Sequence, residues 1–78
     1  MRVSIDMPKL SEENENRIEQ WLKGVGDTVS RGEPIAVIET DKATLDLEAL
    51  QAGTIAEIVH AAGAEVLVGE TIAYLETD

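Results

Sequence analysis

The sequence predicts an all-β fold, a flattened β-barrel or sandwich with internal pseudo-two-fold symmetry. Three observations support this prediction: the chain contains an internal repeat, its apolar residues fall in short β-branched runs, and glycine or proline interrupts it at close intervals. Short strands joined by many turns are typical of sandwiches and barrels rather than of helical bundles. Two similar halves bury both of their apolar faces when they pack against each other about a two-fold axis.

The repeat is visible when Ile18 is aligned with Ile55 and the alignment is continued without a gap. Identical residues then form the pairs Gly26/Gly63, Val29/Val66, Gly32/Gly69, Glu33/Glu70, Ile35/Ile72, Ala36/Ala73, Glu39/Glu76, Thr40/Thr77 and Asp41/Asp78. Such self-similarity is the signature of a duplicated structural unit. Because the glycines recur at equivalent positions, we expect all four to occupy turns with positive φ.

Several apolar runs predict individual strands. Residues 35–38 and 72–75 are too short for helices and are bounded by turn residues. Residues 45–48 alternate apolar and acidic side chains, as a half-buried strand does. These three segments are therefore expected to be strands.

Residues 18–22 are open to two interpretations. Ile18, Trp21 and Leu22 have some helical spacing, so a helix over residues 11–22 is the alternative. Their repeat partner, residues 55–59, reads Ile-Ala-Glu-Ile-Val after a Gly-Thr pair, which is typical of a strand. We therefore predict strands for both segments.

Size and composition favour a carrier, binding or interaction domain. A chain of 78 residues suits one domain spanning residues 1–78. It has no cysteine, so disulfides and thiolate metal sites are excluded. The net charge of −10 argues against nucleic acid and anionic membranes, and it favours a monomer whose partners carry basic docking surfaces. No apolar run predicts a signal peptide or a membrane span, so we expect a cytoplasmic or mitochondrial-matrix protein.

One lysine breaks the symmetry of the repeat. The first copy of Glu-Thr-Asp runs on into Lys42 and Ala43, whereas the second copy is the last segment of the sequence. Lys42 is therefore predicted at the tip of a tight hairpin, where the side chain of Asp41 is expected to bond the backbone ahead of it. Such a lysine projects a flexible stem and a primary amine into solvent. From these residues alone, a solubilising surface lysine is the plain alternative.

Residues 39–43, Glu-Thr-Asp-Lys-Ala, resemble the modification hairpin of the biotinyl/lipoyl attachment family. Residues 7–11, 21–23, 26–29, 32–33 and 68–73 are similar to lipoyl-domain segments in matching order, so the resemblance extends from about Val3 to Leu75. It implies the family's flattened barrel-sandwich hybrid of two four-stranded sheets. Asp-Lys-Ala is similar to lipoyl domains, whereas biotin carriers usually show Met-Lys-Met.

The resemblance implies a lipoyl carrier whose cofactor is lipoate on Lys42. A lipoate ligase or lipoyl transferase would join lipoate, or octanoate converted later, to the ε-amine as an amide. The arm would swing between a thiamine-diphosphate-dependent dehydrogenase, an acyltransferase core and dihydrolipoyl dehydrogenase. The parent chain would be the acyltransferase component of a 2-oxo acid or acetoin dehydrogenase complex, with a linker and core after Asp78. The domain itself would not be an enzyme, because the chemistry belongs to the cofactor.

Two alternatives remain open at this point: a biotin carrier, and an unmodified lipoyl-like module that only docks a partner. An autonomous enzyme ranks last, because the sequence shows no catalytic constellation. His60 is expected to be a surface loop residue rather than an acid or base, and Trp21 is expected to pack, because its repeat partner is Ile58.

The acidic residues near Lys42 have two possible roles. They either dock a partner or form a solvated face, and the sequence favours neither; they are Glu39, Asp41, Asp46 and Glu48. Residues 12–17 depart from the family pattern. They are expected to form a loop near the Lys42 hairpin that tunes partner choice without preventing lipoylation.

Overall fold

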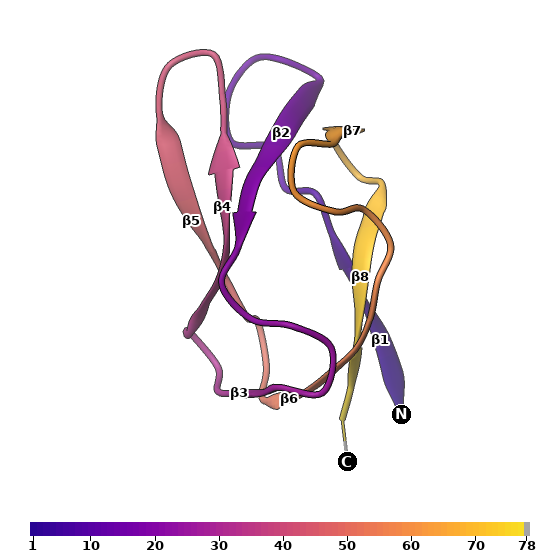
Figure 1. Cartoon of the computed structure of the whole chain (residues 1–78). Helices are drawn as coiled ribbons and strands as arrows, with labels where there is room; N and C mark the ends of the chain where they lie inside the picture. The colour runs from indigo at the N-terminus through magenta and orange to yellow at the C-terminus, as the bar shows by residue number, and fades with distance from the viewer. Residues whose placement is uncertain (78) are drawn as a thin grey trace.

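The computed structural model describes residues 1–77 and contains two four-stranded antiparallel sheets (Figure 1). One sheet has the strand order β1-β8-β6-β3 and the other has the order β5-β4-β2-β7. The strands are β1 (Arg2–Asp6), β2 (Glu15–Trp21), β3 (Thr28–Val29), β4 (Pro34–Glu39), β5 (Thr44–Glu48), β6 (Gly53–Ile58), β7 (Glu65–Leu67) and β8 (Thr71–Glu76). The predicted all-β class and the two sheets are confirmed. Asp78, the predicted repeat partner of Asp41, lies outside the described residues.

The predicted strands at residues 18–22, 35–38, 45–48, 55–59 and 72–75 correspond to β2, β4, β5, β6 and β8. The helical alternative at residues 11–22 is wrong. The loop predicted at residues 12–17 is only partly correct, because β2 already begins at Glu15. There the chain pairs with β7 over three residue pairs, from Glu15↔Leu67 to Arg17↔Glu65. The polar sequence hides the first part of this strand, because Asn16 is the buried residue among residues 15–17.

The predicted pseudo-two-fold symmetry is present, but the halves are interleaved. Exchanging β1 with β5, β2 with β6, β3 with β7 and β4 with β8 converts the strand order of one sheet into that of the other. Each sheet takes its central strands from one half of the chain and its edge strands from the other. The expectation that two half-copies pack face to face is therefore only partly correct, because each sheet contains strands of both halves.

Reciprocal hydrogen bonds join the halves. The N–H of Gly26 donates to the carbonyl of Ile55 at 2.8 Å, and the N–H of Gly63 donates to that of Ile18 at 2.7 Å. Gly26 and Gly63 have φ of 93° and 95°, a conformation that L side chains rarely adopt. Positive φ is also found at the other repeated pair of glycines, so the turn prediction is confirmed.

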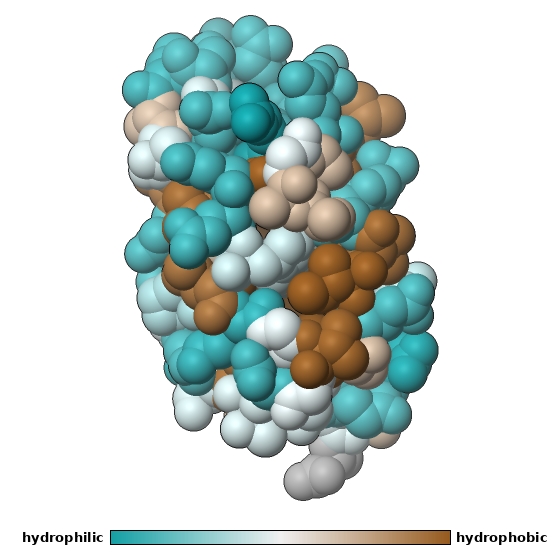
Figure 2. Space-filling model, in the orientation of Figure 1, coloured by the Kyte–Doolittle hydropathy of each residue, from teal (hydrophilic) through white to brown (hydrophobic). Residues whose placement is uncertain are grey.

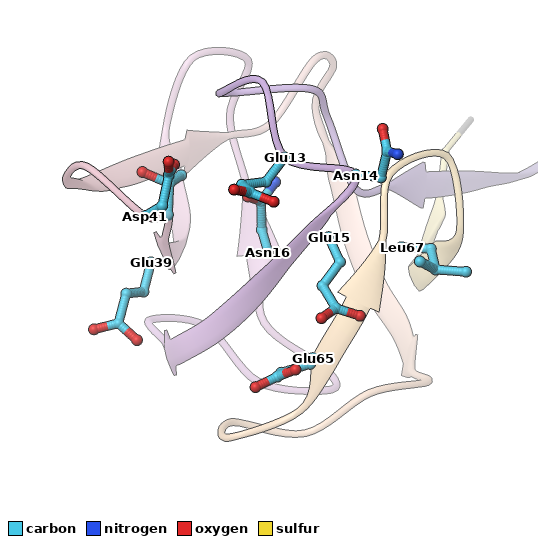
Figure 3. A pocket seen from close by; sticks show the side chains of 9 residues that line it. Glu13, Asn14, Glu15, Asn16, Glu39, Asp41, Glu65 and Leu67 are labelled. Atoms are coloured by element: carbon cyan, nitrogen blue, oxygen red, sulfur yellow. The ribbon is translucent and has the colours of Figure 1, made fainter.

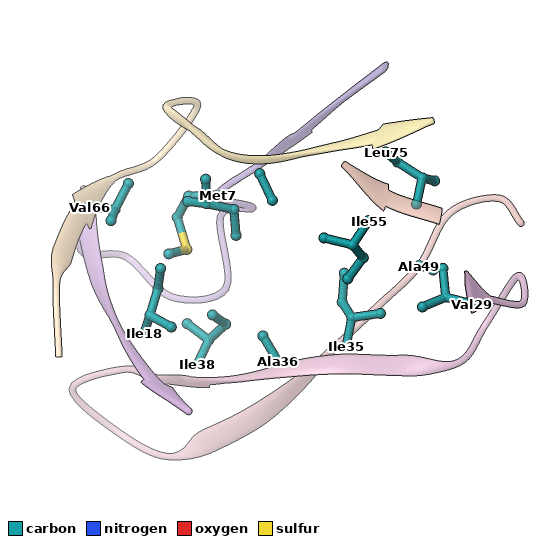
Figure 4. Packing of buried hydrophobic residues seen from close by; sticks show 12 residues of the cluster. Met7, Ile18, Val29, Ile35, Ala36, Ile38, Ala49, Ile55, Val66 and Leu75 are labelled. Carbon is teal, nitrogen blue, oxygen red and sulfur yellow. The ribbon is translucent and has the colours of Figure 1, made fainter. Parts of the chain in front are cut away.

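The core repeats the same symmetry (Figure 4). Its buried apolar residues form the equivalent pairs Met7/Ala49, Ile18/Ile55, Val29/Val66, Ile35/Ile72, Ala36/Ala73 and Ile38/Leu75. These small aliphatic side chains fill the space between the two sheets without any phenylalanine. The two identical sequence patterns are therefore the two matched halves of one core.

Different parts of the chain lie at the two ends of the elongated molecule. The β4–β5 hairpin lies at one end, and the beginning of β1 and the end of β8 lie at the other (Figure 1). The whole measures 35 × 18 × 18 Å. In the face shown in Figure 2, the hairpin end is mostly covered by hydrophilic residues. The fold thus presents the Lys42 hairpin at a polar tip of the molecule.

Candidate functional site

Lys42 is exposed in the short turn that joins β4 to β5 (Figure 1). The two strands pair up to Glu39↔Thr44, and the N–H of Thr40 then donates to the carbonyl of Ala43 at 2.8 Å. Among the described residues, only glycines have positive φ, so Asp41 and Lys42 turn the chain with ordinary backbone angles. The primary amine is therefore carried on an ordered strand pair and points away from the core.

The side chain of Thr40 organises this turn. Its Oγ1 accepts hydrogen bonds from the N–H of Lys42 at 3.2 Å and from the N–H of Ala43 at 3.0 Å. The hydroxyl also donates to the carbonyl of Ala43 at 2.9 Å. The prediction that Asp41 would make such a bond is wrong, because Thr40 stands at the position from which a short side chain reaches the N–H groups two and three residues ahead.

Five carboxylates surround an open depression of about 420 Å³ beside the hairpin (Figure 3). They belong to Glu13, Glu15, Glu39, Asp41 and Glu65, and we call this feature the acidic depression. The expected nearness of the divergent segment to the Lys42 hairpin is confirmed by this shared lining.

Two of the four acidic residues considered as docking contacts, Glu39 and Asp41, line the acidic depression. The other two, Asp46 and Glu48, lie further along β5 and do not line it.

Like charges in the acidic depression act on one another. The pKa of Glu15 is raised, first by a hydrogen bond with the Glu65 side chain and then by the negative charge of that carboxylate. The two carboxylates lie next to each other in Figure 3. This hydrogen bond between β2 and β7 needs one of the two carboxyl groups to be protonated, and when both are ionised they repel each other.

Asn16 is the buried polar residue at the floor of the acidic depression. It is 2% exposed, and its Nδ2 donates to the carbonyl of Pro8 at 3.3 Å. Its Oδ1 has no hydrogen-bond partner within the described residues. The amide thereby ties the segment after β1 to the strand beside the hairpin.

Trp21 and His60 have structural roles here. The Trp21 ring packs against the core, and its Nε1 donates to the backbone carbonyl of His60 at 2.9 Å. The packing prediction for Trp21 is confirmed. His60 lies in the bend after β6 with its side chain half-buried. In residues 1–77, no group of three or more acidic, histidine or cysteine side chains is placed to hold a metal ion.

The chain thus carries an exposed lysine on a hairpin at one end of a duplicated, interleaved β-sandwich. Residues 3–75 match the family described as "Biotin-requiring enzyme", and the chain belongs to this biotin/lipoyl attachment family. It is homologous to the lipoyl domains of 2-oxo acid dehydrogenase acyltransferase components, as the resemblance predicted. No helix in the described part of the chain is long and apolar enough to cross a membrane.

Curated relatives support the assignment. The chain is 50% identical over 80 residues to the pyruvate dehydrogenase E1 component subunit beta of Rhizobium meliloti (strain 1021), covering 100% of the chain and 17% of that protein. It is 46% identical over 80 residues to the dihydrolipoyllysine-residue acetyltransferase component of the pyruvate dehydrogenase complex of the same organism, covering 100% of the chain and 18% of that protein. The chain thus spans less than a fifth of these relatives.

Solved structures share the fold. The lipoyl domain of the 2-oxoglutarate dehydrogenase complex from Azotobacter vinelandii superposes with a TM-score of 0.80 at 37% identity, covering 96% of each chain. Urea carboxylase from Kluyveromyces lactis also superposes with a TM-score of 0.80, at 24% identity over 97% of this chain and 6% of that one. The second likeness concerns the fold alone.

Proposed function

We propose that residues 1–78 form a single lipoyl carrier domain in which Lys42 accepts lipoate through an amide bond. The observation that supports this most is the exposed amine of Lys42, held at the polar tip of the molecule by the Thr40 turn. Lys42 is flanked by Asp41 and Ala43, whereas biotin carriers usually have a methionine on each side of the lysine. The domain is a carrier and not an enzyme by itself.

The chain supplies position, and the lipoyl group supplies a dithiolane that carries acyl groups and electrons when it is bound. Lys42 fits this group, because its amine is exposed and its backbone is anchored by strand pairing immediately behind it. The core between the sheets keeps the hairpin on a rigid base. Tethering at this tip raises the effective concentration of the carried group at each partner that docks the domain.

The partners that follow from this function are a lipoate ligase or lipoyl transferase, a thiamine-diphosphate-dependent dehydrogenase, an acyltransferase core and dihydrolipoyl dehydrogenase. The net charge of −10 suits basic docking surfaces on them. The proposed parent chain is the acyltransferase component of a 2-oxo acid or acetoin dehydrogenase complex, which is supported by the similarity to the acetyltransferase component of Rhizobium meliloti. The corresponding compartment is the bacterial cytoplasm or the mitochondrial matrix.

Reductive acylation tests the carrier function directly. Wild-type domain loaded by a lipoate ligase is incubated with thiamine diphosphate, labelled pyruvate and a bacterial pyruvate dehydrogenase component, and in parallel with 2-oxoglutarate and its dehydrogenase. We expect label on the loaded domain from one of these pairs and none on Lys42→Arg, which keeps the charge but does not form the amide. A loaded domain that neither dehydrogenase acylates would contradict the carrier function in these two complexes.

The segment before β2 is proposed to set partner choice, because Glu13, Asn14 and Glu15 share the acidic depression with the hairpin. A graft of a typical lipoyl-domain segment over residues 12–17 should therefore change which dehydrogenase acylates the domain, while ligase loading of Lys42 continues. Unchanged acylation by both dehydrogenases would show that the segment has no such role.

A further inference from the structure

We infer that Thr40 is a positioning residue for the modification of Lys42, an inference that rests on the proposed role of Lys42 as the acceptor. Its hydroxyl sets the turn before any enzyme binds, so that the lysine is presented in one backbone arrangement. The hydroxyl acts through the backbone of Lys42 and has no part in the amide-forming chemistry.

The Thr40 hydroxyl uses its whole hydrogen-bonding capacity inside the turn. A hydroxyl has one proton to donate and two lone pairs that accept. The proton goes to the carbonyl of Ala43 at 2.9 Å, and the lone pairs receive the N–H groups of Lys42 at 3.2 Å and Ala43 at 3.0 Å. The side chain therefore holds both the lysine and the residue that follows it.

The pseudo-two-fold axis provides an internal comparison. Thr77, the repeat partner of Thr40, also donates its hydroxyl proton across a strand pair, to the carbonyl of Met1 at 3.2 Å. Its N–H donates to the same carbonyl at 2.7 Å, as that of Thr40 does to Ala43. Closing a strand pair is thus common to both ends of the molecule. Holding the N–H of a modifiable lysine is the additional task of Thr40.

A preset turn lowers the cost of enzyme recognition. When only a fraction of the molecules has the arrangement that an enzyme binds, the apparent dissociation constant rises in inverse proportion to that fraction. Asp41 and Lys42 are exposed, and besides the backbone bond from Thr40 to Ala43, the bonds of the Thr40 hydroxyl hold the turn that contains them. Loss of the hydroxyl should raise the KM for the domain and leave kcat unchanged, because no bond to the reacting amine is lost.

Three variants separate this role from general structure. Thr40→Val removes the hydroxyl and keeps the shape, Thr40→Ser keeps the hydroxyl, and Thr77→Val removes the equivalent hydroxyl at the far end of the molecule. With lipoate ligase, lipoate and ATP, we expect KM for Thr40→Val to rise about tenfold at unchanged kcat. Thr40→Ser and Thr77→Val should keep the wild-type KM.

Amide hydrogen exchange of the unmodified domain, followed by NMR, reads the turn without an enzyme. The N–H groups of Lys42 and Ala43 should exchange about tenfold faster in Thr40→Val than in wild type or Thr40→Ser, while β2 and β4 keep their protection. Unchanged exchange, or faster exchange with a wild-type KM, would overturn the role of Thr40. If an active ligase fails to load even the wild type, the proposed function fails as well.

Discussion

At the level of single residues, negative charges outnumber positive ones around the hairpin. Five carboxylates border the acidic depression, and Arg17 reaches only Glu39, at 3.8 Å between Nη1 and Oε1. Such exposed ion pairs add little to stability. The uncompensated charge therefore destabilises the fold slightly at neutral pH, in a place where a basic partner surface would gain from it.

The Glu15–Glu65 pair makes this cost measurable. The folded state raises the pKa of Glu15 above its ordinary value of 4.5. Protonated Glu15 therefore stabilises the fold at pH values below 4.5, and this stabilisation is lost as the pH rises through the pKa of the folded state. Glu15→Gln should therefore raise the Tm at pH 7, and the gain should shrink towards pH 4. Thermal unfolding at both pH values measures it. The exposed Glu19 on the same strand is the control, and an equal gain from Glu19→Gln would contradict the pairwise cause.

A charged side chain at the buried position of Asn16 is expected to destabilise the fold. Asn16→Asp removes the donor to the Pro8 carbonyl and places a carboxylate at a position that is 2% exposed. We expect a loss of about 3 kcal/mol in the free energy of unfolding at pH 7, measured by urea denaturation. Burial raises the pKa of the new carboxyl, so the loss should diminish as the pH falls and the acid becomes neutral. A loss that does not depend on pH would show that charge burial is not the cause.

The sequence identified Lys42 and missed Thr40, for a physical reason. Lys42 could be recognised because residues 39–43 resemble the modification hairpin of the family. Thr40 has an identical counterpart in Thr77, so it resembled a strand residue shared by both halves. Its special role depends on the two N–H groups that follow it in the folded turn, which no repeat comparison shows.

At the level of strands, close backbone approach fixes where β6 begins. β6 pairs with β8, with Thr54 opposite Glu76, and a Cβ added to Gly53 would lie 2.5 Å from the carbonyl oxygen of Glu76. Gly53→Ala should therefore cost about 2 kcal/mol of unfolding free energy. Gly24→Ala is the matched control, because its Cβ would meet Asp27 at an ordinary 3.8 Å. Urea denaturation of both variants measures the difference, and equal stabilities would contradict the steric account.

The strands that could be predicted are those with apolar runs. β4 and β8 are recognisable because buried aliphatic residues dominate them. The strands β3 and β7 span only two and three residues, with a single buried side chain in each. They form because other strands supply their partners, which is information that a local sequence pattern does not contain.

At the level of the whole molecule, the repeat predicts equivalence but not pairing. It identified four of the core pairs as identical residues, which the structure places in equivalent positions. It did not show that each sheet combines central strands from one half with edge strands from the other. A sandwich in which each half forms its own sheet and one in which both halves contribute to each sheet would have the same sequence pattern. The long-range backbone hydrogen bonds distinguish the two arrangements.

Interleaving predicts that neither half folds alone. Residues 1–41 and residues 42–78 each lack strands that complete both sheets. Separately prepared peptides of these halves should therefore show unfolded circular dichroism and NMR spectra, whereas the intact chain is folded. A half that gives dispersed amide signals by itself would contradict the interleaved core.

We propose that Lys42 is the residue that carries the cofactor. This role of Lys42 is tested most directly by the intact mass of the domain, with peptide mapping, after incubation with lipoate, ATP and an active lipoate ligase. We predict the addition of one lipoyl group on Lys42 in the wild type and in a Lys9→Arg control, and none in Lys42→Arg. An adduct on another lysine, or an adduct formed only with biotin and a biotin ligase, would contradict the claim.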